Sequence, residues 1–93
     1  MTEKLITETV GTFFLVLTIG LTVLGGYSSA PVVIGSVLMV MVYMGGHISG
    51  AHYNPAVTLA VFLRRKIPGG EAAAYMIVQF LGAVLAAIVV AVL

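Results

Sequence analysis

The 93 residues of this chain are 61% hydrophobic and 8% charged, with a formal net charge of +1. A soluble domain needs more charge to cover its surface, so the composition excludes one and indicates a chain whose solvent is lipid. The four cations fall in two short places, so no nucleic-acid partner is expected, and the absence of cysteine excludes thiol chemistry.

The first apolar run, residues 5–24, is long enough to cross a hydrocarbon core of ~30 Å at ~1.5 Å per residue. Lys4 before it and the small residues 28–30 after it are also typical of a signal peptide. The run is longer than the apolar core of most signal peptides and contains Glu8, which favours a retained membrane helix.

Two further spans are expected. Residues 31–47 follow an uncharged Gly/Ser turn, and Pro31 suits the first turn of a helix. The last span, residues 72–93, has no charged residue and follows a Pro-Gly-Gly turn. Small residues four apart, at 46 and 50 and at 82 and 86, predict places where helices approach closely.

A half-helix is predicted between the last two spans. Asn54 is a good N-cap and Pro55 a good first helical residue, but the apolar pattern lasts only to Leu63, where Arg64, Arg65 and Lys66 follow. Residues 55–63 would measure ~14 Å, about half of a bilayer core. If this segment enters and returns, Lys4 and the basic cluster share one side. Basic loops stay in the cytoplasm, so the N-terminus and the Arg64–Lys66 loop are predicted to be cytoplasmic in a multi-pass cell-membrane protein.

A helix that begins inside a membrane leaves backbone groups that lipid cannot bind, at several kcal/mol each. Such backbone is tolerated in a protein interior or beside a water-filled cavity. The Asn54 amide and the positive end of the helix dipole suit a neutral polar solute and repel cations. These features favour a channel, and a re-entrant loop that plugs a larger assembly is the alternative.

Three motifs carry a family resemblance. Residues 46–58 resemble the first Asn-Pro-Ala loop of the aquaporin family, and residues 8–13 resemble the first-helix motif of that family. Its third-helix motif is matched by Tyr75, Gln79, Gly82 and Ala83. The resemblance implies an all-α membrane protein, with residues 1–93 as one half of the aquaporin inverted repeat. Three transmembrane helices and one re-entrant half-helix make up that half.

The resemblance also implies a passive water channel without a cofactor. Asn54 would donate to the passing oxygen, and the carbonyls of residues 50–52 would accept hydrogen bonds. The residues expected to line the pore are Asn54, Pro55, Ala56, Gly50, Ala51, His52, Ile34 and Val57. Strict water channels of the family carry a bulky aromatic residue where Ile34 stands, and Val57 matches the position of the second repeat's arginine. These aliphatic residues raise glycerol or another small neutral solute as an alternative.

Only one half-repeat is present, so membrane lipid and a second, inverted half-repeat are the expected partners. Two identical antiparallel chains could complete the pore, and four such pairs would match the family's tetramer. The one-sided positive charge opposes antiparallel insertion, and favours a separate second-half chain or a longer channel of which this sequence is a piece. A non-conducting assembly subunit is the third functional hypothesis.

The remaining polar residues are assigned mainly structural roles. Glu8 and Gln79 are expected to bind the backbone of the re-entrant loop. His52 either lines the pore or anchors the loop, and His47 is expected to be buried and hydrogen-bonded. Two histidines without carboxylate or thiol neighbours make a poor metal site. The sequence also shows no nucleophile–base pair of the kind that an enzyme would use.

Overall fold

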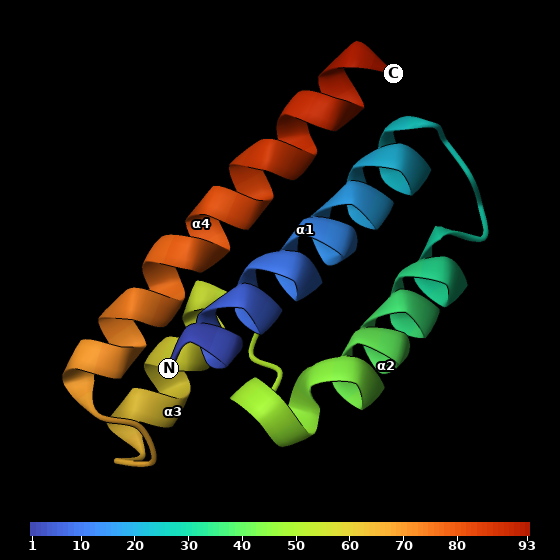
Figure 1. The fold of residues 1–93 in the computed structure, drawn as a ribbon. Coiled ribbons are helices and arrows are strands. Elements are labelled where there is room, and N and C mark those ends of the chain that lie inside the picture. The colour runs from blue at the N-terminus through green and yellow to red at the C-terminus, as the bar shows by residue number, and fades with distance from the viewer.

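A computed structural model describes all 93 residues as four helices: α1 (Thr2–Leu24), α2 (Ala30–Ser49), α3 (Pro55–Leu63) and α4 (Gly69–Val92). Three of them are long and apolar enough to cross a membrane, whereas α3 has nine residues. This confirms the expected all-α architecture of three spans and a half-helix. Helix α1 lies between α4 and α2, and α3 packs on α4 (Figure 1).

The long helices extend beyond their predicted ends. Helix α1 begins at Thr2 and not at residue 5, α4 begins at Gly69 and not at residue 72, and α2 continues to Ser49, past residue 47. The polar residues at these ends lack the apolar pattern but are compatible with helical backbone. Helix α2 then ends because Gly50 adopts the left-handed conformation, with φ 89°.

Helix α3 covers residues 55–63, the segment expected from the sequence. Asn54 caps it, since its Oδ1 accepts a hydrogen bond from the N–H of Ala56 at 2.8 Å, and Pro55 occupies the first helical position. The chain leaves the lower end of α2, climbs back into the molecule, and descends again as α3 (Figure 1). The longest dimension of the molecule is 39 Å, so a helix of ~14 Å spans only part of it.

Helices α1 and α4 meet through small residues. A Cβ atom on Gly82 would lie 2.6 Å from the carbonyl oxygen of Thr9, and Ala86 is fully buried. Close approach at residues 82 and 86 is therefore confirmed. The same expectation for residues 46 and 50 is wrong, because Gly50 lies outside the helix and a Cβ on Gly46 would meet no other element. Gly45 makes the close contact instead, against side chains of α1 and of the re-entrant loop.

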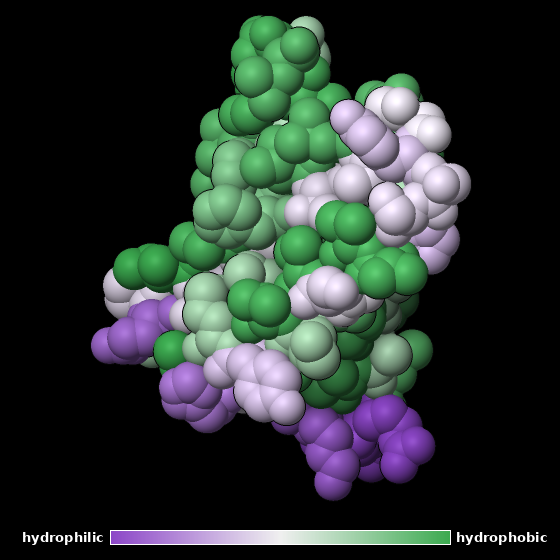
Figure 2. Space-filling model, turned by 90° about the vertical axis from the view of Figure 1, so that its right-hand side faces the viewer, coloured by the Kyte–Doolittle hydropathy of each residue, from purple (hydrophilic) through white to green (hydrophobic).

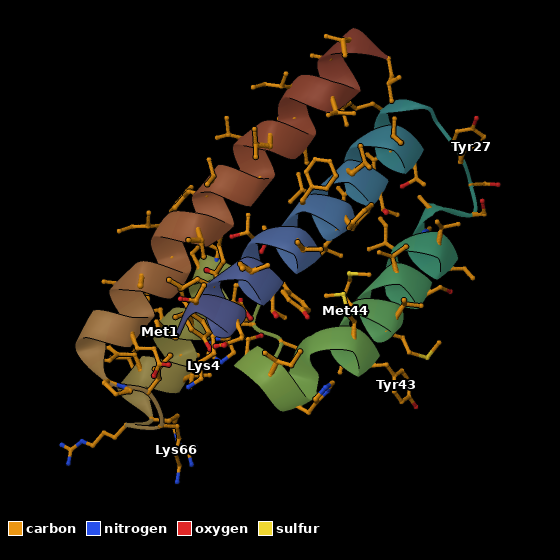
Figure 3. The ribbon with its side chains drawn as sticks, viewed as in Figure 1. Met1, Lys4, Tyr27, Tyr43, Met44 and Lys66 are labelled. Atoms are coloured by element: carbon orange, nitrogen blue, oxygen red, sulfur yellow. The ribbon has the colours of Figure 1, made fainter.

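The surface is that of a membrane protein. Large hydrophobic side chains are exposed on all four helices, and Figure 2 shows apolar residues over most of the visible face, with the strongly hydrophilic ones towards the lower end. Lys4 and Lys66 lie at the same end of the molecule (Figure 3). The chain is thus a multi-pass membrane protein whose cations gather at one end.

The α1–α4 contact can be tested by adding one methyl group. Gly82→Ala should lower the free energy of unfolding by about 1–3 kcal/mol, because the new Cβ collides with α1 backbone that cannot move independently. Gly35→Ala is the matched control, since no atom lies within 4 Å of its Cβ position. Unfolding in detergent, followed by circular dichroism, measures both. Equal stability of the two variants would contradict the close packing.

Candidate functional site

The re-entrant loop between α2 and α3 has a strained backbone. Gly50, Ala51 and Tyr53 all have positive φ, at 89°, 56° and 55°. Glycine adopts this conformation readily, but other residues in it cost of order 1–3 kcal/mol each. The loop persists in this form only if its surroundings supply compensating bonds.

Glu8 of α1 supplies these bonds. Its carboxylate is fully buried, and each oxygen accepts two hydrogen bonds. Oε1 accepts from the N–H of Tyr53 and from Nε2 of Gln79, both at 2.8 Å. Oε2 accepts from Oγ of Ser49 at 2.6 Å and from the N–H of His52 at 3.1 Å. One side chain therefore joins α1, α2, the loop and α4.

A second set of bonds extends from Gln79, which binds side chains and not the loop backbone, so the expectation of a direct bond to that backbone is wrong. Its Nε2 also donates to Oγ1 of Thr58 at 2.9 Å, and the same oxygen lies 2.9 Å from Nδ1 of His52. Because the Thr58 hydroxyl already accepts from Gln79, its proton is available for His52. This arrangement favours the tautomer in which Nδ1 accepts and Nε2 carries the proton.

Two tyrosines complete the support of the loop. The Tyr53 ring occupies the space left by Gly11 and Gly45, and its hydroxyl donates to the carbonyl of Met41 at 2.7 Å. The Tyr75 hydroxyl donates at 2.7 Å to the carbonyl of residue 49, the last residue of α2. Both rings are buried, so neither α2 nor α4 can shift without moving the loop.

The opposite side of the loop keeps its polar groups free. The N–H groups of residues 51–53 all bind side chains of the protein, whereas the carbonyls of residues 50–52 accept no hydrogen bond from it. Asn54 is exposed, and since its Oδ1 caps α3, its Nδ2 remains available. A row of acceptors, one amide donor and the positive end of α3 thus lie next to each other.

An open hollow of about 200 Å³ lies beside the start of α3, between α1 and α4. Two of its lining residues carry polar atoms that are buried without a partner, Oγ1 of Thr12 and Oε1 of Gln79. The other lining residues are Leu15, Val16, Ile19, Tyr53, Asn54, Pro55, Phe80 and Ala83. The wall of the hollow is therefore mostly apolar, and the two unsatisfied polar atoms are buried beneath it.

The structure brings most of the predicted site residues together but not all of them. Residues 50–52 and 54–57 form one continuous segment, with the side chains of Ala56 and Val57 exposed. Ile34 is separate, because it lies roughly 22 Å along α2 from Ser49 and α2 does not pack on α3. His52 anchors the loop through both its main chain and its ring. The expectation for His47 is wrong, since its side chain is exposed and forms no hydrogen bond, two residues before Ser49, the last residue of α2.

Four supporting hydroxyl residues were not assigned roles from the sequence: Ser49, Tyr53, Thr58 and Tyr75. A buried carboxylate in an apolar span signals that donors must exist, but only the fold identifies them. No group of three or more histidine, aspartate or glutamate side chains converges to hold a metal.

Replacing the carboxylate tests its part in the loop. Glu8→Gln should lower the free energy of unfolding by at least about 2 kcal/mol, because one oxygen becomes an NH₂ group facing two donors. Amide hydrogen exchange at residues 52 and 53 should accelerate. Glu3→Gln is the control, since that side chain is 81% exposed. Unchanged exchange at the two loop amides would show that Glu8 does not hold the loop.

Comparison with known proteins agrees with this geometry. The model of the family described as major intrinsic protein matches residues 1–93. The chain is 42% identical to putative aquaporin NIP4-1 of Arabidopsis thaliana over 95% of its own length and 34% of the relative's. It is 45% identical to aquaporin NIP1-1 of Oryza sativa subsp. japonica (91% and 33%) and 42% identical to nodulin-26 of Glycine max (90% and 34%). The chain spans about a third of the length of these curated relatives. It corresponds to the N-terminal half of an aquaporin-type fold, and it belongs to the major intrinsic protein family.

Proposed function

We propose that this chain forms one half of a passive membrane channel for water, completed by a second half-repeat of opposite orientation. The observation that carries the proposal is the two-sided loop. Its N–H groups bind inward, to Glu8 and Ser49, and its carbonyls and the Asn54 amide are left without protein partners. Polar backbone of this kind is stable in a membrane only beside water or protein.

In this proposal a water molecule exchanges its hydrogen bonds step by step along the loop. The carbonyls of residues 50–52 accept its protons, and Nδ2 of Asn54 donates to its oxygen. The positive end of α3 raises the electrostatic cost of a cation at the same point. The loop itself needs no movement, because Glu8, Gln79 and Tyr53 hold it in place.

The hollow beside Pro55 supports the proposal of a second half. Its wall is largely apolar and includes Asn54, whose exposed amide nitrogen has no protein partner, which suits a protein segment that brings both apolar and polar groups. An inverted half-helix that begins at the same depth would fit there. It would come from an antiparallel copy, from a separate chain or from the rest of a longer protein, and four such pores would assemble as a tetramer. The gathering of cations at one end favours the last two sources.

A small neutral solute such as glycerol is the second candidate. Val57 is 42% exposed directly after the Asn-Pro-Ala segment, and Ile34 is also aliphatic. In the proposed pore these side chains narrow the path less than an aromatic ring and offer an apolar surface to a carbon backbone. Comparison of water and glycerol fluxes in the same vesicles separates the two solutes.

Asn54→Asp is the most direct test of the proposed pore. The carboxylate retains the oxygen that caps Ala56, so α3 should remain folded, but the amide donor is lost and a negative charge replaces it. We expect water permeability of vesicles to fall at least about tenfold, equivalent to ~1.4 kcal/mol in barrier height. Osmotic shrinkage of liposomes, read by light scattering, measures this flow.

The test is run first with this chain alone and then with a second half supplied. Flow with the chain alone, lost in Asn54→Asp, supports a pore of antiparallel copies. Flow only with the second half, and lost in the same variant, supports a mixed pore. A folded assembly that conducts no water in either case contradicts the channel and supports a structural plug. Water flow that is unchanged by Asn54→Asp contradicts the proposed pore in the same way.

The absence of cysteine gives a further prediction. Thiol-directed mercury should leave the flow through assemblies of this chain alone unchanged, because no thiolate is present to bind it. Mercury is added to the same liposomes before the osmotic shock. Block at low dose would contradict the prediction and point to another site of action.

A further inference from the structure

The turn between α3 and α4 forms a basic hollow at the end of the molecule where the N-terminus lies. The hollow is open and measures about 690 Å³. Its apolar part comes from Phe62, Leu63 and Ile67, and its polar part from Arg65, Lys66 and the backbone at Gly69. In Figure 3 the Lys66 side chain extends away from the helices, beyond the end of the bundle.

The cations of this turn have no internal counter-ion. The fourth cation, Lys4, binds the Glu71 carboxylate at 2.9 Å. The remaining acids are the buried Glu8 and the exposed Glu3, which lies 3.7 Å from the terminal amine. The three successive cations at residues 64–66 are exposed and form no ion pair, so their charge is available to an external anion.

The backbone adds donors on the same side. The first N–H of α4 to find an acceptor belongs to Ala72, which donates to the carbonyl of Pro68 at 2.9 Å. The N–H groups of Gly69, Gly70 and Glu71 donate to no protein acceptor, and the positive end of the helix dipole lies there. The Glu71 carboxylate in this first turn is neutralised by Lys4, which reduces its repulsion of an anion.

The turn places the side chains of Arg64 and Arg65 in different hollows. Arg65 has a φ of 58°, held by its N–H bond to the carbonyl of Phe62 at 2.8 Å. Arg65 lines the hollow against α4, Arg64 lines a different one beside Ala60 and Val61, and Lys66 lies between the two hollows and lines both. Arg64 therefore carries the same charge as Arg65, one residue away, outside the proposed site.

We propose that this hollow binds an anionic phospholipid, with the phosphate between Arg65, Lys66 and the first N–H groups of α4. The first part of an acyl chain would lie on Phe62, Leu63 and Ile67. Charge complementarity identifies the occupant, since an unpaired cationic rim next to an apolar floor, at one end of a membrane-spanning bundle, matches a lipid with a charged headgroup. The proposal does not depend on what the channel conducts.

The experiment measures lipid binding to the purified full chain in neutral detergent. The probes are dioctanoyl phosphatidylglycerol, dioctanoyl phosphatidylcholine with the same chains but no net charge, and inorganic phosphate without chains. Native mass spectrometry gives the affinity of each. We expect phosphatidylglycerol to bind most tightly, and Arg65→Gln and Lys66→Gln each to weaken it about fivefold. Arg64→Gln should leave the affinity unchanged.

Three outcomes would overturn the proposal. An equal loss in all three variants would indicate attraction to net charge without a site. Equal binding of phosphatidylcholine would show that the headgroup charge is not recognised, and phosphate binding as tightly as phosphatidylglycerol would indicate a free-anion site. Circular dichroism of each variant verifies that its helices are intact, so a loss of binding reports on the site and not on folding.

Discussion

The buried carboxylate of Glu8 is the interaction on which the rest of the structure depends. It lies in an apolar bundle with no cation beside it, so its charge is compensated by hydrogen-bond donors alone. Two of the four donors are backbone N–H groups of the re-entrant loop. Because these groups point inward, the carbonyls of the same peptides are free on the other side. The bonds that stabilise the fold are thus the ones that create the polar surface of the candidate site.

The half-helix and the spans could be predicted from the sequence because their signals are local. Asn54-Pro55 marks a start, Arg64 follows the end, and the length between them is short for a membrane. The sequence predicts starts for α1 and α4 that are three residues too late, since polar residues such as Lys4 lack an apolar pattern even when they are helical. The support of the loop is not local, because Gln79 and Glu8 are 71 residues apart. Whether Ser49 and Gln79 reach the carboxylate depends on how α1 packs against α2 at Gly45 and against α4 at Gly82.

The two proposals concern two hollows that suit different kinds of occupant. At the centre of the molecule, the largely apolar hollow beside Pro55 is open and, in the proposed function, receives a second protein segment. At the basic end, cations without acidic partners line the hollow proposed to bind an anionic phospholipid. Apolar packing and the Asn54 amide determine what suits the first hollow, and positive charge determines what suits the second. An occupant of one would therefore not substitute for an occupant of the other.

The sequence separation of the Glu8 bonds also constrains how the chain can be made. The partners of this carboxylate lie 41 to 71 residues further along, so Glu8 is synthesised before all of them. A charged side chain held alone in hydrocarbon is costly, and the nascent α1 is therefore better kept in a hydrated protein environment than released into lipid. Gln79 is the last donor to be synthesised. The polar centre is therefore completed late in biogenesis, after α4 has packed beside α1. The insertion of α1 into lipid has to wait until the later helices are made.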